Sequence, residues 1–352
     1  MGTIAAANYE VRPFLPELRQ SRLCAAITAP PRRDANMSDL LPMRSERPKL
    51  LITAVDGLVG ANLACCLADR FEVLGISQRP APNAPGWDRL LGPISETVTL
   101  RRTVNYFRPD WIIHCGPLSA GIWDLGEPVQ AEREVQRTKC LAAAARQISA
   151  RLTVILTDAM FCGPRLFHRT DDRPASRSPA AMTAARIERS LVASGALVVR
   201  THAFGWSPPK AEPSFAERSW LALKEGRTLE YEPQQHASPI LASDLAELLY
   251  EAYNRRLEGL QHMAGAERVG MGRFVRDLAL ALGLQGEIAP AAAPSQPSRG
   301  RLCETALDSR PAQLLLEHAM PLFWPGLLRF VAQASNGYRA RLQAVAVRRA
   351  AA

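Results

Sequence analysis

The chain has 352 residues, of which 47% are hydrophobic and 22% charged, which is ample for a sizeable core in one large domain or two. Its formal net charge of +9 comes mostly from scattered arginines, and this distribution indicates affinity for a phosphate-bearing ligand rather than for nucleic acid. No apolar run approaches the roughly 20 residues needed to span a bilayer, so a membrane-spanning protein is excluded.

The cysteines indicate a reducing compartment. None of the seven forms a Cys-x-x-Cys pair, and Cys65 and Cys66 are adjacent within a helical pattern. They are expected to be reduced, buried thiols. The N-terminus lacks the basic-then-apolar order of a secretory signal, so the cytoplasm is the expected location. No set of His, Cys and carboxylate residues has metal-site spacing, and no metal is predicted.

The first 47 residues show no sustained period and contain Pro-Pro at 31–32, which predicts a disordered extension. A misplaced start is the alternative, because Met37 and Met43 both precede the first strand closely. From Lys49 onward, short apolar strands alternate with helices. The strands are expected at 50–53, 71–77, 111–115, 152–157 and 197–201, and the helices at 58–69, 98–107, 129–149 and 179–194. The stretch 78–97 is rich in Pro and Gly and is expected to be loose.

This alternation predicts an α/β fold of the Rossmann type, a doubly wound parallel sheet with helices on both faces and right-handed crossovers. After Thr201 the alternation weakens, and helices are expected at 213–225, 243–256, 271–282 and 322–334, with a loop at 288–300. We therefore expect a dinucleotide-binding domain at 48–205 and a smaller, interleaved C-terminal α/β substrate-binding part at 206–335. The remainder, 336–352, is expected to be a solvated basic tail rather than a basic helix.

The first predicted strand runs into a turn that has the spacing of a dinucleotide-binding loop. Ala54, Gly57 and Gly60 stand at the three glycine positions of a G-x-x-G-x-x-G pattern, between a strand and a helix. Glycine lets the backbone approach a pyrophosphate, and the helix N-terminus supplies amide donors. An ordinary tight turn is the alternative. The residues expected to contact the cofactor here are Thr53, Ala54, Asp56, Gly57, Leu58, Val59 and Gly60.

The end of the second predicted strand favours NADP over NAD. No Asp or Glu stands there to bind the ribose hydroxyls, whereas Ser77 and Arg79 could hold a 2′-phosphate. A solvated loop arginine is the alternative interpretation of Arg79.

Several segments, in order, resemble the dTDP-4-dehydrorhamnose reductase-like branch of the extended short-chain dehydrogenase/reductase family. They cover about residues 50–335, and each matches a family pattern in part. The segments are Thr53-Ala-Val-Asp-Gly-Leu-Val-Gly60, Arg108-Pro-Asp-Trp-Ile-Ile-His-Cys115, Leu156-Thr-Asp-Ala-Met-Phe-Cys-Gly163, Asp171-Asp-Arg-Pro174, Val199-Arg-Thr201, Gln235-His-Ala-Ser-Pro239 with Ala242-Ser-Asp-Leu245, and Gly259-Leu-Gln-His-Met-Ala-Gly265.

The resemblance implies a nicotinamide cofactor, a nucleotide-sugar ligand and a catalytic Ser/Thr, Tyr and Lys. Thr157 stands at the hydroxyl position, and Cys115 and Gly116 are implied to lie beside the cofactor. The Tyr position falls on Met182 and the Lys position on Arg186. Methionine cannot transfer a proton, and arginine keeps its proton too tightly for a relay. The scaffold therefore resembles the family while its proton-transfer residues differ.

Other polar residues are candidates for a replacement acid or for substrate contact. His168, Asp171 and His202 are the candidate acids, although each could equally be a solvated or satisfied polar group. Trp206, with Phe204, could stack on a nucleotide base or seal the core. Gln235 and His236 are expected at the substrate or in a turn, and His114 and His262 are interpreted as core histidines.

Two functions remain open. The first is an NAD(P)-dependent nucleotide-sugar reductase or epimerase-like enzyme that transfers hydride at a 4-keto sugar. The second is a catalytically inactive regulatory or scaffold protein that keeps the dinucleotide pocket. Met182 and Arg186 favour the second, whereas the glycines and Thr157 favour the first. A homodimer is an open alternative to a monomer, and no nucleic acid or membrane partner is expected.

Overall fold

The computed structural model describes residues 47–77, 87–91, 97–126, 130–209, 211–229, 231–284 and 303–343, with the backbone alone for 87–91. All of them belong to one compact unit that begins at Glu46. The predicted extension 1–47, apart from its last residue, and the predicted loop 288–300 lie outside the described residues.

The centre of this unit is a seven-stranded parallel sheet with the strand order β10-β6-β5-β4-β1-β2-β3. The order reverses between β1 and β4, and in such sheets ligands bind beyond the carboxyl ends of the strands near this point. The strands are β1 (Lys49–Thr53), β2 (Glu72–Ser77), β3 (Trp87–Leu91), β4 (Trp111–Cys115), β5 (Arg151–Thr157), β6 (Leu197–Thr201) and β10 (Gly259–His262).

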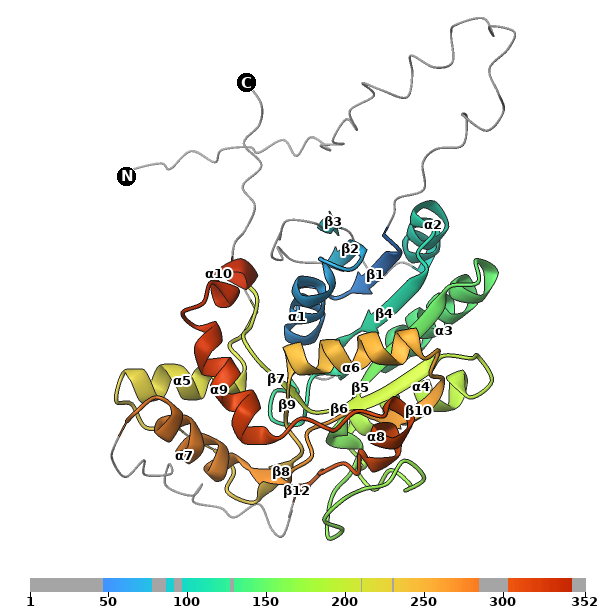
Figure 1. The fold of residues 1–352 in the computed structure, drawn as a ribbon. Helices are drawn as coiled ribbons and strands as arrows, with labels where there is room; N and C mark the ends of the chain where they lie inside the picture. Colours follow the sequence, from blue (N-terminus) through green and yellow to red (C-terminus); the bar gives the residue numbers. More distant parts are fainter. Residues whose placement is uncertain are drawn as a thin grey trace, which may run out of the picture. The chain divides into compact units, whose positions relative to one another are not determined.

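Helices cover both faces of this sheet because its central strands are apolar on both sides. Leu50 and Ile52 of β1 pack with α1 and α6 on one face, whereas Leu51 packs with α2, α3 and α4 on the other (Figure 1). Every residue of β4 is buried, as expected for a strand enclosed by two helical layers. These helices are α1 (Leu58–Leu67), α2 (Thr97–Phe107), α3 (Ala131–Gln147), α4 (Pro179–Leu191) and α6 (Ala242–Asn254).

The smaller part is built around an aromatic core. The ring of Phe204 lies 5.3 Å from that of Phe274 and 5.9 Å from that of Phe330, so strand β7 is joined to helices α7 and α9. Two small sheets, β11-β8-β12 and β7-β9, complete it. Its elements are β7 (Ala203–Phe204), α5 (Phe215–Lys224), β8 (Gln235–Ala237), β9 (Ile240–Leu241), β11 (Val269–Gly270), α7 (Met271–Ala281), β12 (Cys303–Glu304), α8 (Arg310–Leu316), α9 (Phe323–Gln333) and α10 (Tyr338–Gln343).

Two expectations from the sequence are wrong. The loose stretch 78–97 contains an edge strand, β3, which pairs with β2 alone. The predicted solvated tail begins with helix α10, which docks on α1 and buries Tyr338 and Leu342. The Tyr338 hydroxyl donates to Oδ1 of Asn62 at 2.8 Å, and Nδ2 of Asn62 donates to the carbonyl of Trp206 at 2.9 Å. Residues 344–352 of the tail lie outside the described residues.

A buried polar cluster joins α4 to the sheet edge. Arg200 of β6 is 2% exposed and donates to both carboxylate oxygens of Glu188 at 2.6 and 2.7 Å. Its Nη1 lies 3.1 Å from Nε2 of His262, which is 1% exposed. Burial, together with the charge of Arg200, lowers the pKa of His262 to about 3. His262 is therefore uncharged in the folded protein at neutral pH.

This buried histidine predicts a loss of stability in mild acid. An unfolded histidine titrates near 6.5, so stability that is present above that pH is lost as the pH falls toward the folded value. Between about pH 7.5 and about pH 5, His262 is expected to reduce the free energy of unfolding by about 2 kcal/mol. Urea unfolding at the two pH values measures this loss, which should shrink in His262→Gln. The exposed His318 gives the matched control, His318→Gln, which should keep the full loss. An unchanged pH dependence in His262→Gln would contradict the prediction.

Candidate functional site

The turn after β1 has an unusual backbone. Ala54 adopts φ 52°, the left-handed region that favours glycine, and its carbonyl accepts from the amide of Gly57 at 3.0 Å. The amide of Val55 donates to the carbonyl of Ile76 at 3.2 Å, which ties the turn to the end of β2. The sequence predicted this turn, and the positive φ explains why glycine is the usual residue at position 54.

Helix α1 begins directly after this turn and touches it closely. A Cβ on Gly60 would lie 2.4 Å from the Ala54 carbonyl oxygen, so only glycine fits. At the N-cap, Gly57 has no side chain with which to cap the first-turn amides of Leu58 and Val59. Amides at a helix N-terminus, together with the helix dipole, suit a phosphate group. This turn therefore fits the diphosphate of a dinucleotide.

The end of β4 lies next to this turn. The Thr53 hydroxyl donates to the carbonyl of Cys115 at 2.8 Å and contacts Nδ1 of His114 at 2.8 Å. Both Cys115 and His114 are buried, and burial raises the pKa of the Cys115 thiol far above its ordinary value. Thr53 and Cys115 thus hold the two strand ends together through their hydroxyl and backbone groups.

A carboxylate from α3 fills the space beside Gly116. A Cβ on Gly116 would lie 2.1 Å from Oε1 of Glu134, which also lies 3.3 Å from Nε2 of His114 in an ion-pair contact without hydrogen-bond alignment. Arg137 donates to the other oxygen at 2.6 Å. Burial favours a higher pKa for Glu134, but His114 and Arg137 outweigh it and lower the pKa.

Thr157 ends β5 and is fully buried. Its Oγ1 accepts from the amide of Ala159 at 3.1 Å and lies 3.5 Å from Oδ1 of Asp158, so the hydroxyl caps the 3₁₀ turn Asp158–Met160. This turn is adjacent to the start of α4, because the amides of Ala175 and Ser176 both donate to the carbonyl of Met160.

Three segments of the chain converge on the carboxylate of Asp158, which follows β5 and is completely buried. Oδ1 accepts from the amide of Ile122 at 2.8 Å, and Oδ2 accepts from Nδ1 of His202 at 2.8 Å and from the hydroxyl of Thr305. Since β5 and β6 pair with Thr157 opposite Thr201, the residues that follow them, Asp158 and His202, lie side by side. Asp158 thereby joins the loop after β4, the ends of β5 and β6, and the segment after β12.

The residues at the expected Tyr and Lys positions lie on α4. The side chain of Met182 is exposed, and that of Arg186 donates to Oε2 of Glu132 on α3 at 2.7 Å. This ion pair is largely exposed, with 42% of the Arg186 side chain and 65% of the Glu132 side chain accessible to solvent. Met182 and Arg186 therefore lie at the surface of the helix pair, and the Arg186 guanidinium is engaged by α3.

The structure distinguishes between the other residues expected at the site. Trp206 is completely buried, its ring stacks on Phe330 at 4.4 Å and its Nε1 donates to the Phe330 carbonyl at 3.1 Å, so it belongs to the core rather than to a ligand surface. Ser77 is buried at the end of β2, and its Oγ has no partner in the described part of the chain. Arg79 lies outside the described residues.

Gln235 and His236 lie in β8 and are half-buried. The carbonyl of His236 accepts from the amide of Thr305 at 2.9 Å and from its hydroxyl at 3.1 Å. The same hydroxyl donates to Asp158, so Thr305 connects the predicted substrate loop to the end of β5.

Of the remaining candidates, His168 stacks on Phe161 at 4.3 Å and belongs to the core.

Two further groups near Asp158 were not indicated by any motif. Thr305 is 147 positions away from Asp158 and matches no motif. Asp124 accepts from the amide of Phe215 and lies 3.6 Å from Arg218, and 15% of its side-chain surface is exposed to solvent. Burial raises the pKa of Asp124, although the Phe215 amide and Arg218 act in the opposite direction. Asp171, another candidate acid, lies at the surface with Arg169 at 3.2 Å.

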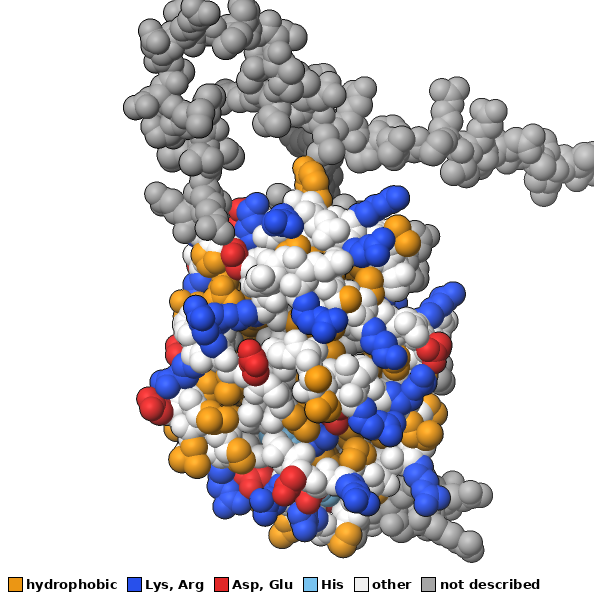
Figure 2. Space-filling model, turned by 90° about the vertical axis from the view of Figure 1, so that its right-hand side faces the viewer, with side chains coloured by type: hydrophobic (Ala, Val, Ile, Leu, Met, Phe, Trp, Pro, Cys, Tyr) orange, Lys and Arg blue, Asp and Glu red, His pale blue; other side chains and the backbone are white. Residues whose placement is uncertain are grey.

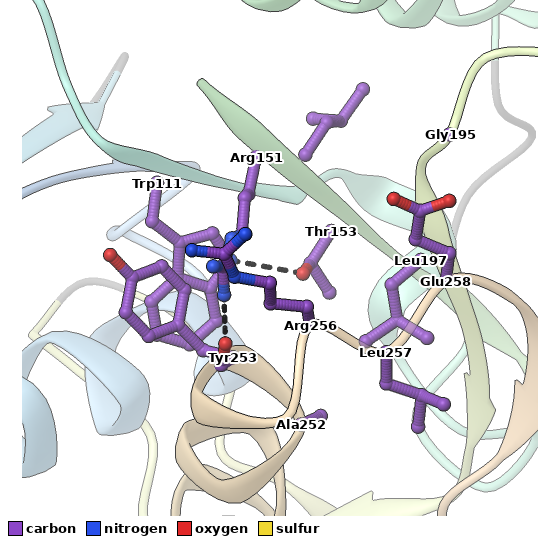
Figure 3. A pocket seen from close by; sticks show the side chains of 11 residues that line it. Trp111, Arg151, Thr153, Gly195, Leu197, Ala252, Tyr253, Arg256, Leu257 and Glu258 are labelled. Atoms are coloured by element: carbon purple, nitrogen blue, oxygen red, sulfur yellow. Dashed lines mark hydrogen bonds between the residues drawn. The ribbon is translucent and has the colours of Figure 1, made fainter. Parts of the chain in front are cut away.

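The pocket in Figure 3 lies at the opposite, amino edge of the sheet. The residues that line it contact one another, and these contacts give them a structural role. The ring of Trp111 stacks on Tyr253 at 4.6 Å, and its Nε1 donates to Thr153 at 3.0 Å. The Arg151 guanidinium lies over the Tyr253 ring and donates to the Tyr253 carbonyl. A cation at the carbonyl end of a helix is favourable, so Arg151 stabilises the end of α6.

The surface and the described side chains add three observations. Basic side chains are spread over the face in Figure 2 rather than gathered in one patch. Within the described ranges, no three His, Cys, Asp or Glu side chains are grouped to hold a metal ion. No helix among the described elements has the length and apolar character required to cross a membrane.

A sequence profile of the RmlD substrate binding domain matches residues 48–335. The chain has no significant match among curated protein sequences. Its fold is similar to a hypothetical dTDP-4-dehydrorhamnose reductase from Sulfolobus tokodaii, with 23% identity, a TM-score of 0.65, and coverage of 79% of this chain and 98% of that one.

Two further solved structures share the fold. The dTDP-4-dehydrorhamnose reductase of Bacillus anthracis in complex with NADP is 19% identical, with a TM-score of 0.65 and coverage of 82% of this chain and 99% of that one. The enzyme WbmH of Bordetella bronchiseptica in complex with NAD+ is 18% identical, with a TM-score of 0.66 and the same coverages. At these identities the likeness establishes the fold alone.

The close approach of Gly60 to the turn predicts the effect of a single methyl group. Gly60→Ala places a Cβ 2.4 Å from the Ala54 carbonyl oxygen, so the helix or the turn must shift. The cost is expected to be about 1–3 kcal/mol of unfolding free energy, measured by urea denaturation. A Cβ on Gly126 would meet no atom within 4 Å, so Gly126→Ala is the control and should leave stability unchanged. Equal stability of the two variants would contradict this packing.

Proposed function

This chain belongs to the RmlD substrate binding domain family of extended short-chain dehydrogenases/reductases, and on that premise we propose that it is an NAD(P)-dependent oxidoreductase acting on a nucleotide-sugar. Its reaction would be of the dTDP-4-dehydrorhamnose reductase type, in which hydride is transferred at a 4-keto sugar. The single observation that carries the proposal is the turn from Ala54 to Gly60, whose helix N-terminus and glycine contacts suit a diphosphate.

The nicotinamide cofactor, when bound, supplies the hydride. The chain's own groups would hold it at the carboxyl edge of the sheet. The first-turn amides of α1 would bind the diphosphate, and the strand ends at Thr53 and Cys115, with Gly116, would lie beside the cofactor. Ser77, whose buried hydroxyl lacks a partner in the described chain, supports adenosine ribose binding at the end of β2. We propose NADP as the preferred form, because Ser77 is not acidic.

The nucleotide-sugar would bind between the strand ends and the smaller part. Gln235 and His236 are the proposed contacts, and their link to Asp158 through Thr305 supports this. We propose the cytoplasm as the compartment, since none of the described cysteines that the structure places forms a disulfide.

A second function is favoured by one observation. Met182 is exposed and has no ionisable group, and Arg186 is held by Glu132 on α3. A protein with these residues could bind a dinucleotide and a nucleotide-sugar without turnover, as a regulatory or scaffold protein. The two functions differ in a measurable way, because the first requires hydride transfer and the second requires binding alone.

Calorimetry tests the binding step that both functions share. NADPH or NADH is expected to bind the purified protein, and the comparison of the two decides the preferred form. Gly57→Asp places a carboxylate at the phosphate position, where a Cβ makes only an ordinary 3.4 Å contact. Charge repulsion should weaken binding roughly tenfold or more, which is about 1.4 kcal/mol. Gly126→Asp, at an open position, is the control. If neither nucleotide binds, the proposal is wrong.

Turnover separates the enzyme from the binding protein. The unmodified protein is expected to oxidise NADPH in the presence of a dTDP-4-dehydro-sugar, and Thr157→Ala should reduce this rate because Thr157 is held at the end of β5. In contrast, activity that appears only in the double variant Met182→Tyr/Arg186→Lys would support the binding function, because that variant restores a hydroxyl acid and a lysine. The assay follows NADPH absorbance in both proteins.

A further inference from the structure

The ring of His202 is fixed in one orientation. Its Nδ1 lies 2.8 Å from Oδ2 of Asp158, and because a carboxylate can only accept, Nδ1 carries a proton and donates. The edge of Trp123 packs against the ring at 4.5 Å between centroids. A Cβ on Gly121 would lie 2.6 Å from Nδ1, so this glycine leaves room for the imidazole. Three separate contacts therefore hold the ring.

The second ring nitrogen of His202 differs from those of the other buried histidines. His114 Nε2 and His262 Nδ1 are enclosed without a hydrogen-bond partner, and His168 Nε2 lies 2.9 Å from the carbonyl of Glu304. Within the described part of the chain, Nε2 of His202 makes no hydrogen bond, and it is not fully enclosed as those two nitrogens are. The His202 side chain is only 1% exposed, so this nitrogen is the small part of the ring that a ligand at the carboxyl edge of β5 and β6 would contact.

We propose that His202 is the proton-transfer residue of this site and that Asp158 is its positioning residue. The proposal rests on the oxidoreductase function proposed above. Asp158 fixes the imidazole through Nδ1, which directs Nε2 toward the oxygen of the nucleotide-sugar. An acceptor that holds one nitrogen of a histidine determines both the tautomer and the orientation of the other nitrogen. The pair supplies a proton donor at the strand ends. Met182 and Arg186 of α4, at the Tyr and Lys positions, do not provide one.

The proton balance of the step is simple. In the reducing direction His202 reacts as an imidazolium, with a proton on each ring nitrogen: hydride from the reduced nicotinamide is added to the carbonyl carbon of the sugar, and the proton on Nε2 moves to the carbonyl oxygen. The products are an alcohol, the oxidised nicotinamide and a neutral imidazole, which regains its proton from water. In the reverse direction, neutral Nε2 accepts the hydroxyl proton as hydride leaves the carbon.

The same carboxylate also organises the hydroxyl group expected to assist. Oδ1 of Asp158 lies 3.5 Å from the Thr157 hydroxyl, while Oδ2 holds His202 and Thr305. The charged groups that face His202 are Asp158, from the turn after β5, and Asp124, from the loop after β4, which is paired with Arg218 of α5. These groups surround the imidazole with two carboxylates and one more distant cation, an arrangement that stabilises a transient positive charge.

The first test is independent of turnover. Nitrogen-15 spectra of the histidine side chains, with the His202 signal identified by its loss in His202→Gln, should show a proton on Nδ1. In Asp158→Asn this preference should disappear. When NADP+ and dTDP-glucose are added, the Nε2 signal of His202 should shift, whereas the signal of the exposed His318 should not. The absence of a shift, with both ligands bound by calorimetry, overturns the assignment. If neither ligand binds, the proposed function fails and the His202 assignment fails with it.

The second test uses the reaction. With NADPH and a dTDP-4-dehydro-sugar, His202→Gln is expected to lower kcat by about 10²–10⁴, the usual contribution of a general acid. KM and the cofactor Kd should change far less than kcat, because the proton itself is transferred only in the transition state. His318→Gln is the matched control and should keep full activity. A folded His202→Gln protein that retains kcat overturns the proposal.

Discussion

The buried carboxylate of Asp158 is the constraint on which the arrangement of the site depends. A charge with no exposure to water is tolerated only when its oxygens are paired, and here the donors come from Ile122, His202 and Thr305. Each donor belongs to a different segment. The loop after β4, the end of β6 and the segment after β12 must therefore all reach their final positions before this carboxylate is satisfied. One side chain thus couples the Rossmann sheet to the smaller part.

Much of the fold could be predicted from the sequence because its central strands are short, apolar and buried on both faces. The two errors have a common cause, which is that local polarity concealed a tertiary contact. Strand β3 (Trp87–Leu91) pairs with one neighbour only and contains Asp88 and Arg89, so it lacks the apolar run of a central strand. In α10, the arginines around Tyr338 and Leu342 obscured two apolar residues four positions apart, the spacing of one helix face.

The site was predictable to a different extent in its two halves. The turn at Ala54 and Gly60 is local, so glycine spacing between a strand and a helix was enough to locate it. The surroundings of His202 depend on residues far apart in the chain, such as Thr305, and no spacing rule connects them. Trp206 illustrates the same limit, since its position after β6 suited either a ligand or the core, and only its stacking on Phe330 decides for the core.

Helix α10 has a practical consequence for anyone who shortens this protein. The family match ends at residue 335, before the helix begins, yet Tyr338 reaches α1 through Asn62, which in turn holds the backbone at Trp206. Cutting the gene at the profile boundary would expose the apolar side of α1. It would also remove the Tyr338 hydroxyl that donates a hydrogen bond to Asn62. Preparations for crystallisation or binding assays should therefore extend through Gln343, and affinity tags are better fused beyond that point.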